Sequence, residues 1–178
     1  MKKVLYILGE MTDEDIEWML SAGRPRALPA GETLIRQGDP IDALYIVTEG
    51  LFDVTVDSGG GGKLAELGAG EVLGEISFVD ARPPMATVQA TAEGRVLGIP
   101  REALKRKLTD DVGFAARFYR AISMFLADRL RDTVSQMGYG AENRLDGGME
   151  DELDLDRLET ASRGGVNFER IVQRLREI

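Results

Sequence analysis

The sequence predicts a mainly β fold with flanking α-helices, in which an antiparallel β-roll (jelly roll) lies between N-terminal helices, a long C-terminal helix and a helical tail. Short β-rich runs cut by glycine turns fill residues 24–100, and their regular spacing is typical of a closed antiparallel barrel. Amphipathic helical patterns stand on both sides of these runs. We therefore divide the chain into an N-terminal helical segment (1–23), the roll with its long helix (24–137) and an acidic linker with an amphipathic helical tail (138–178).

The first segment has the start and the stop signals of a helix. Thr12 and Asp15 have the spacing of a capping box, in which each side chain bonds the main-chain N–H of the other. Gly23 lies where helices commonly end. The apolar stripe between these signals is Ile16, Met19 and Leu20.

The roll is predicted from its β-rich runs and from the turns between them. The runs are 33–35, 43–47, 52–56, 63–65, 86–90 and 95–99. Residues 58–62, Ser-Gly-Gly-Gly-Gly, are expected to form a flexible hairpin tip. A phosphate loop is a weak interpretation of this glycine run, because neither a Lys-Thr pair nor a helix follows it.

Two helices are expected after the roll. Pro100 precedes a short helix over 101–108, and Asp110 is expected to cap a long helix that runs to about Met137. At 1.5 Å per residue that helix is roughly 40 Å long, more than a small barrel can cover. We therefore expect a homodimer through residues 110–137. The apolar stripe of the long helix is Phe114, Phe118, Ile122, Phe125, Leu126 and Leu130.

The tail concentrates the acidic charge of the protein. Residues 141–160 carry eight acidic and two basic side chains, which is −6 of the total formal charge of −9, and their first half reads as a linker. Asn167 is expected to cap a last helix, which is too short to be stable unless a surface buries its apolar face. That surface belongs either to the protein's own barrel or to a partner protein. The apolar face is Phe168, Ile171, Val172 and Leu175.

The composition excludes several classes of function. The chain has no cysteine and no histidine, so it lacks thiol nucleophiles, the usual general base and the commonest metal ligands. We therefore predict no catalytic residues, no metal site and no enzymatic activity. The net charge of −9 opposes nucleic-acid binding, which needs basic side chains. No apolar run is long enough to span a bilayer, and we expect a cytoplasmic protein that does not bind membranes.

The candidate site is the stretch 74–90, GEISFVDARPPMATVQA. It opens with Gly-Glu, the start of a phosphate-cradling loop, and closes with Ala-Thr-Val, the usual exit into a strand. An arginine that holds the phosphate is expected beside Met85, but Pro84 occupies that position and the nearest arginine is Arg82.

Other residues extend this pattern through the roll. They are Gly31, the run 34–39 (LIRQGD), and Asp42, Tyr45, Val47 and Gly50 in a D-x-x-Y-x-V-x-x-G arrangement. With the loop, they make roughly residues 12–137 resemble the cyclic nucleotide-binding domain of the catabolite activator protein and of protein kinase A regulatory subunits. The resemblance implies an eight-stranded roll with a short phosphate-loop helix, and cyclic AMP or cyclic GMP as the ligand. No cofactor is required.

The resemblance also implies a role for each residue of the loop. The short helix begins near Glu75 and directs its free N–H groups toward the phosphate. Glu75 accepts a hydrogen bond from the ribose 2′-hydroxyl, and the Ser77 amide donates to a phosphate oxygen. After the loop, the main-chain amides of Met85 and Ala86 and the Thr87 hydroxyl add hydrogen-bond donors. The candidate ligand-binding residues are Gly74, Glu75, Ile76, Ser77, Arg82, Met85, Ala86 and Thr87.

The chain departs from the family at Pro84, where the arginine would make a bidentate charged contact. A charge-assisted hydrogen bond is worth about 1.5–3 kcal/mol, so its loss predicts binding weaker by at least about tenfold to a hundredfold. Arg82 is open to two interpretations: it reaches the phosphate, or it faces solvent or braces the loop against Asp80 or Glu75. Glu75 likewise either binds ribose or only caps the short helix.

Two hypotheses for the function follow, and a carboxylate-based hydrolase is a distant third. The first is a regulatory sensor with a degenerate phosphate loop, so that cyclic nucleotide binding is weak or altered. The second is a ligand-free adaptor that uses its helices and tail to dock, because the whole chain also looks like small bacterial proteins grouped with bacteriocin-type peptide export systems. The transcription factors of the family append a basic DNA-reading helix, whereas an acidic stretch follows the long helix here.

Overall fold

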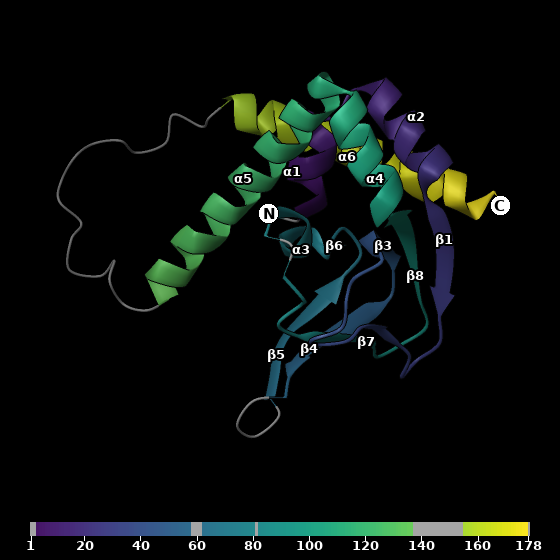
Figure 1. The fold of residues 1–178 in the computed structure, drawn as a ribbon, viewed down its shortest axis with the longest axis vertical. Helices are drawn as coiled ribbons and strands as arrows, with labels where there is room; N and C mark the ends of the chain where they lie inside the picture. Colours follow the sequence, from purple (N-terminus) through teal and green to yellow (C-terminus); the bar gives the residue numbers. More distant parts are fainter. Residues whose placement is uncertain (1–2, 58–61, 81, 137–154, 178) are drawn as a thin grey trace.

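The computed structural model describes residues 3–57, 62–80, 82–136 and 155–177, so the acidic linker and all but the last residue of the expected hairpin tip (58–62) lie outside the described residues. Within these ranges the chain folds into a β-roll with a layer of helices over one end (Figure 1). The strands are β1 (Arg24–Leu28), β2 (Thr33–Ile35), β3 (Ala43–Glu49), β4 (Leu51–Val56), β5 (Gly62–Gly68), β6 (Val72–Leu73), β7 (Thr87–Ala90) and β8 (Gly94–Pro100). The helices are α1 (Lys3–Glu10), α2 (Asp13–Ala22), α3 (Glu75–Val79), α4 (Arg101–Asp110), α5 (Val112–Gln136) and α6 (Leu155–Arg176).

The eight strands form two four-stranded antiparallel sheets, in the orders β1-β8-β3-β6 and β2-β7-β4-β5. This confirms the predicted antiparallel roll with flanking helices. Two of the strands, β1 and β6, were not among the β-rich runs predicted from the sequence. The sequence of β1, RPRAL, carries a proline and two arginines, but β1 is the edge strand of its sheet, where a proline removes no ladder hydrogen bond.

The buried side chains of β3 explain how the two halves of the molecule are joined. Alternate residues of a strand point to opposite faces of the sheet. Tyr45 and Val47 belong to the apolar cluster inside the roll, whereas Leu44 and Ile46 belong to a second cluster under the helices. Because both faces are covered, β3 is a continuous apolar run and shows no polar alternation. The second cluster also receives side chains from α1, α2, α4, α5 and α6.

Helix α2 begins and ends where the sequence predicted. The capping box is present, since the Thr12 hydroxyl accepts from the Asp15 N–H at 3.3 Å and the Asp15 carboxylate accepts from the Thr12 N–H at 2.9 Å. Gly23 follows the helix with a φ of −74°, so it does not adopt the left-handed conformation of a glycine stop. A Cβ here would lie 2.5 Å from a Leu97 methyl carbon and 2.7 Å from the Met19 carbonyl oxygen, and this crowding favours glycine.

The expected cap of the long helix was wrong by one residue. Asp110 is the last residue of α4, and Asp111 caps α5 by accepting from the Phe114 N–H at 2.8 Å. Asp111 also pairs with Lys107 at 2.8 Å. The sequence has two neighbouring aspartates here, Asp110 and Asp111, and the one that caps α5 is the one that also pairs with Lys107.

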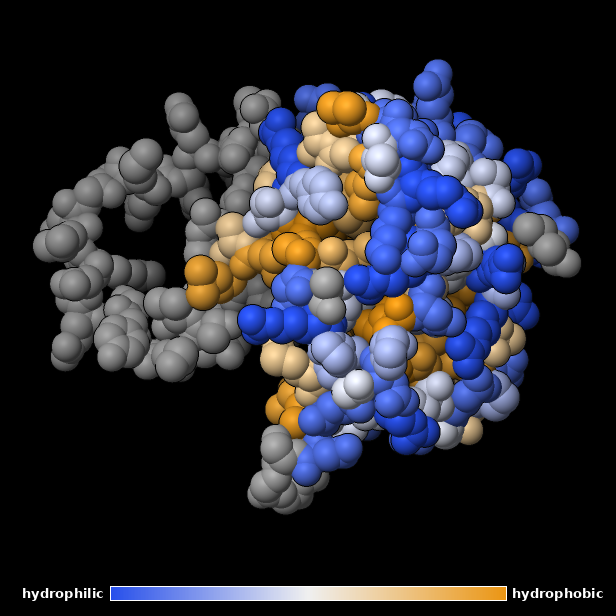
Figure 2. Space-filling model, viewed as in Figure 1, coloured by the Kyte–Doolittle hydropathy of each residue, from blue (hydrophilic) through white to orange (hydrophobic). Residues whose placement is uncertain are grey.

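The apolar stripe of α5 is covered along its first half only. Phe114, Phe118, Ile122 and Phe125 are buried, whereas Leu130 is 65% exposed. Helix α5 projects past the roll in Figure 1, and apolar surface runs along its flank in Figure 2. Among the described residues, none covers Leu130.

The described part of the tail forms one continuous helix, α6, so the prediction that Asn167 caps its last part was wrong. Asn167 lies in the interior of α6, is buried, and donates from Nδ2 to the Leu8 carbonyl oxygen at 2.8 Å. Helix α6 packs on α1 and α2 of the same chain, where Ile171 is fully buried. Arg170 pairs with Asp13 at 2.9 Å at the outer edge of this contact.

Candidate functional site

The candidate loop connects β6 to β7 and starts with a glycine that its geometry requires. Gly74 precedes α3 with a φ of +88°, a left-handed conformation that costs other residues energy. A Cβ at this position would also lie 3.1 Å from the Ala43 carbonyl oxygen. Helix α3 is therefore held close to the start of β3.

The two polar residues of α3 that the resemblance assigned to the ligand are both buried. Glu75 is 4% exposed and Ser77 is 5% exposed. A carboxylate in the first turn of a helix interacts favourably with the partial positive charge of the helix N-terminus. Ile76 is half-buried between them. The position of Glu75 suits a helix cap and a ribose contact equally, so both interpretations of this residue stay predictions.

The exit of the loop is tied to the turn between β2 and β3. The Pro84 carbonyl oxygen accepts from the Gly38 N–H at 2.9 Å, and the Thr87 hydroxyl accepts from the Gln37 N–H at 3.1 Å. A hydroxyl that accepts one hydrogen bond retains its own proton to donate. These contacts explain why the run 34–39 accompanies the loop in the sequence pattern.

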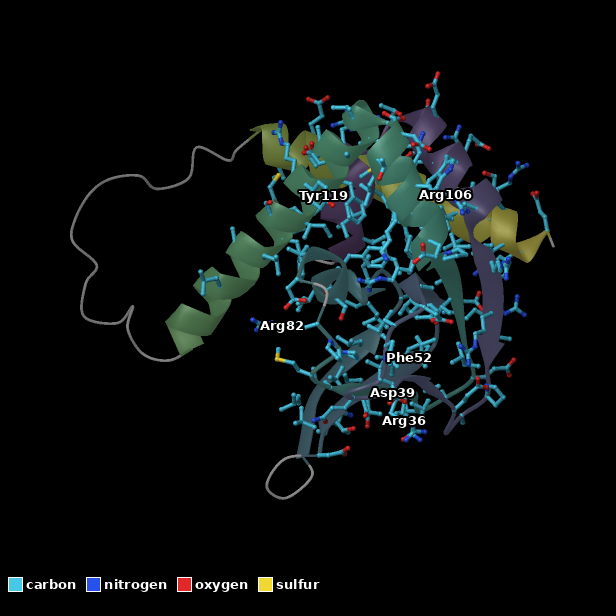
Figure 3. The ribbon with its side chains drawn as sticks, viewed as in Figure 1. Arg36, Asp39, Phe52, Arg82, Arg106 and Tyr119 are labelled. Carbon is cyan, nitrogen blue, oxygen red and sulfur yellow. The ribbon has the colours of Figure 1, made fainter. Side chains whose placement is uncertain are left out.

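The structure places Arg82 and Met85 on the surface. The main-chain N–H of Arg82 donates to the Asp80 carboxylate at 3.0 Å, whereas its side chain is exposed and makes no ion pair with any residue that the structure describes. Figure 3 shows this side chain at the flank of the roll, directed outward. Met85 is 77% exposed, and Ala86 behind it is half-buried. The exit of the loop therefore carries no inward-facing cation from Arg82.

The D-x-x-Y motif forms the corner on which the loop rests. The Tyr45 hydroxyl donates to the Asp42 carboxylate at 2.6 Å, and burial, then this hydrogen bond, raises the pKa of Tyr45 to about 12. The Asp42 carbonyl oxygen accepts from the N–H of Arg101 at 2.7 Å. The Arg101 side chain reaches back to α3, where it donates to the Ser77 carbonyl oxygen at 2.8 Å. Arg101 is not among the residues predicted for the site, although an arginine directly after Pro100 at a helix start is visible in the sequence.

Helices α2 and α5 are joined by an ion pair between a buried carboxylate and a partly buried guanidinium. Arg117 on α5 donates twice to the Asp15 carboxylate, at 2.7 and 2.9 Å. Burial of Asp15 would raise its pKa, but the hydrogen bonds from Arg117 and Thr12 hold that pKa below its ordinary value. Asp15 on α2 is therefore charged under ordinary conditions and fixes α2 to α5.

The described residues give no sign of a metal site, since none of their acidic side chains gather in groups of three or more that could hold an ion. None of the described helices is both long enough and apolar enough to cross a membrane.

The comparisons with known proteins agree with this geometry. A family model described as the cyclic nucleotide-binding domain matches residues 25–111. The cAMP-dependent protein kinase regulatory subunit of Blastocladiella emersonii is 31% identical over 118 residues, which are 65% of this chain and 29% of that protein. The chain thus spans less than a third of the length of this curated relative.

Solved structures are similar over most of the chain. The N-terminal domain of a transcriptional regulator from Streptomyces coelicolor A3(2) is 32% identical with a TM-score of 0.61, over 73% of this chain and 94% of that one. The catabolite activator protein of Thermus thermophilus is 23% identical with a TM-score of 0.63, over 97% of this chain and 87% of that one. At that identity the second likeness concerns the fold alone.

Proposed function

Because the chain belongs to the cyclic nucleotide-binding domain family, we propose that it is a regulatory module without enzymatic activity, whose β6–β7 loop binds a cyclic nucleotide weakly or in an altered way. One observation carries the proposal. The loop keeps Gly74 and a buried Glu75 at the start of α3, but it has Pro84 at the arginine position and an Arg82 that faces solvent.

The phosphate of the ligand is the group that loses most without the arginine. A cyclic nucleotide brings one negative charge into a partly enclosed site, and a charge without a partner there is costly. The amides of α3 and the Thr87 hydroxyl supply neutral donors, which are worth less than a guanidinium. Pro83 and Pro84 supply no N–H at all. The base and ribose then contribute most of the affinity.

Isothermal titration with cyclic AMP and cyclic GMP tests the proposal. We expect dissociation constants at least about tenfold weaker than a loop with the arginine would give, and we expect Glu75→Ala to abolish the heat of binding. Arg82→Ala separates the two interpretations of that residue, because only an arginine that swings onto the phosphate affects affinity. No heat with either nucleotide, at any concentration up to millimolar, would overturn the proposal.

We also propose that the protein is a cytoplasmic homodimer joined through residues 110–137. The exposure of Leu130, at 65%, supports this, because a leucine at a stripe position normally packs against apolar surface. Native mass spectrometry tests it: Leu130→Glu is expected to shift the mass from dimer to monomer, and the control Lys105→Glu, at an exposed site on α4, is expected to leave the dimer intact. A wild-type monomer would contradict the proposal.

A further inference from the structure

Arg101 stands at the meeting point of three parts of the structure. It is the first residue of α4 and directly follows β8. Its main-chain N–H donates to the Asp42 carbonyl oxygen at 2.7 Å, just before β3 begins. The backbone of Arg101 is therefore fixed to the sheet, while its side chain is free to hold another element.

That element is the end of α3. Nη2 of Arg101 donates to the Ser77 carbonyl oxygen at 2.8 Å, and its guanidinium carbon lies 4.7 Å from the centroid of the Phe78 ring. The last carbonyl groups of a helix have no partner within the helix, and a cation near them is stabilising. A guanidinium over an aromatic face adds a cation–π attraction. Two independent contacts thus join one side chain to two consecutive residues of α3.

The other end of α4 is also joined to α5. Lys107 of α4 pairs with Asp111 at 2.8 Å, and Asp111 caps α5 through the Phe114 N–H. Helix α3 is only about 7.5 Å long at 1.5 Å per residue, so a shift of the ligand loop displaces the whole of it. The static contacts therefore form an unbroken chain from α3 through Arg101 to α4 and, through the Asp111 corner, to α5.

We propose that Arg101 is the positioning residue that couples the ligand loop to α4 and α5, an inference that rests on the proposed function for its ligand step. It does not contact ligand itself. Its removal leaves the loop present but disconnects the loop from the helices. The same link holds the end of α3 in place when no ligand is bound.

The ligand-free protein tests the link first, by hydrogen exchange. In Arg101→Met the amide of Asp80, which donates to the Ile76 carbonyl oxygen, is expected to exchange about tenfold faster, the factor for one lost charged hydrogen bond. Arg101→Lys keeps the positive charge but not the planar guanidinium, and its Asp80 exchange rate is expected to lie between those of Arg101→Met and wild type. Arg106→Met is the matched control, since Arg106 is exposed on the same helix and makes no ion pair with the described residues (Figure 3). Unchanged exchange at Asp80 in Arg101→Met would overturn the proposal.

The ligand arm uses cyclic AMP on the Pro84→Arg background, in which the loop regains its cation. Binding is expected to slow exchange both in α3 and in the first turns of α5. With Arg101→Met added, protection of α3 is expected to remain and protection of α5 to be lost, a split that a merely stabilising residue would not produce. An α5 response that survives Arg101→Met overturns the coupling. If Pro84→Arg binds no cyclic AMP, the proposed function fails instead, and the ligand-free exchange alone decides on Arg101.

Discussion

The contact between α1 and α6 predicts opposite effects for two neighbouring glycines. Gly164 and Gly165 both lie inside α6. A Cβ on Gly164 would lie 2.3 Å from the Leu5 carbonyl oxygen and 2.7 Å from the Leu5 Cα atom, whereas a Cβ on Gly165 would meet only a Leu5 methyl carbon at 4.0 Å. Alanine is thus incompatible with the close approach at the first position and compatible with it at the second.

The magnitudes follow from two competing terms. Replacing a helix-interior glycine by alanine stabilises by about 0.8–1 kcal/mol through helix propensity, and Gly165→Ala is expected to gain about that amount. At Gly164 the same gain opposes a clash with main-chain atoms, which cannot rotate away. Overpacking of this kind costs about 1–3 kcal/mol or more. Because the propensity gain is the same in both variants, their free energies of unfolding are expected to differ by the overpacking cost, about 1–3 kcal/mol.

Urea unfolding measures this difference. Trp18 is the only tryptophan of the chain and lies on α2, against which α6 also packs, so its fluorescence reports the helical layer. With an m-value of about 2 kcal/mol per molar, the midpoints of the two variants should lie about 0.5–1.5 M apart, with Gly165→Ala the more stable. Equal midpoints, or a Gly164→Ala variant more stable than wild type, would refute the docking of α6 on α1.

Three further outcomes are expected. Asp15→Asn should destabilise by about 2–3 kcal/mol, because it leaves the partner Arg117 partly buried without its anion, whereas Asp13→Asn, at an exposed pair, should stay within about 0.5 kcal/mol of wild type in the same urea assay. In ultraviolet titration Tyr45 should ionise near pH 12, and Asp42→Asn should lower that value. The urea midpoint should change little between about pH 5.5 and 7, because the chain has no histidine. At pH values below about 4 the urea midpoint should fall. The pKa of Asp15 is lowered on folding, so its stabilisation is complete above the unfolded pKa of about 3.9 and is lost as the pH falls through the folded pKa.

Features fixed by neighbours in sequence were predictable from the sequence. The capping box at Thr12 and Asp15 depends on two residues three apart, and both bonds are present. The stripe of α5 follows from helical periodicity, and its first four members are buried. The roll itself follows from the spacing of short β-rich runs.

Features fixed by contacts across the chain were not predictable. Asn167 favours helix caps in general, but its hydrogen bond to the Leu8 carbonyl oxygen spans most of the sequence and places it inside α6. Strand β1 was not predicted because it contains Pro25. A proline is accepted in an edge strand, and only the strand order of the sheet shows that β1 is at the edge. In the candidate site, the sequence did not decide whether Arg82 reaches the phosphate or faces solvent. The role of Arg101 was not predictable, because its partner Ser77 lies on another element.

We propose that cyclic nucleotide binding is weak because the loop has Pro84 in place of the phosphate-binding arginine, and one calorimetric comparison tests this most directly. Cyclic AMP is titrated into wild type, into Pro84→Arg, and into Pro83→Arg, which adds the same charge one residue away at an exposed position. We expect Pro84→Arg to bind at least about tenfold more tightly than wild type, with Pro83→Arg close to wild type. A wild-type protein that already binds as tightly as Pro84→Arg would contradict the account.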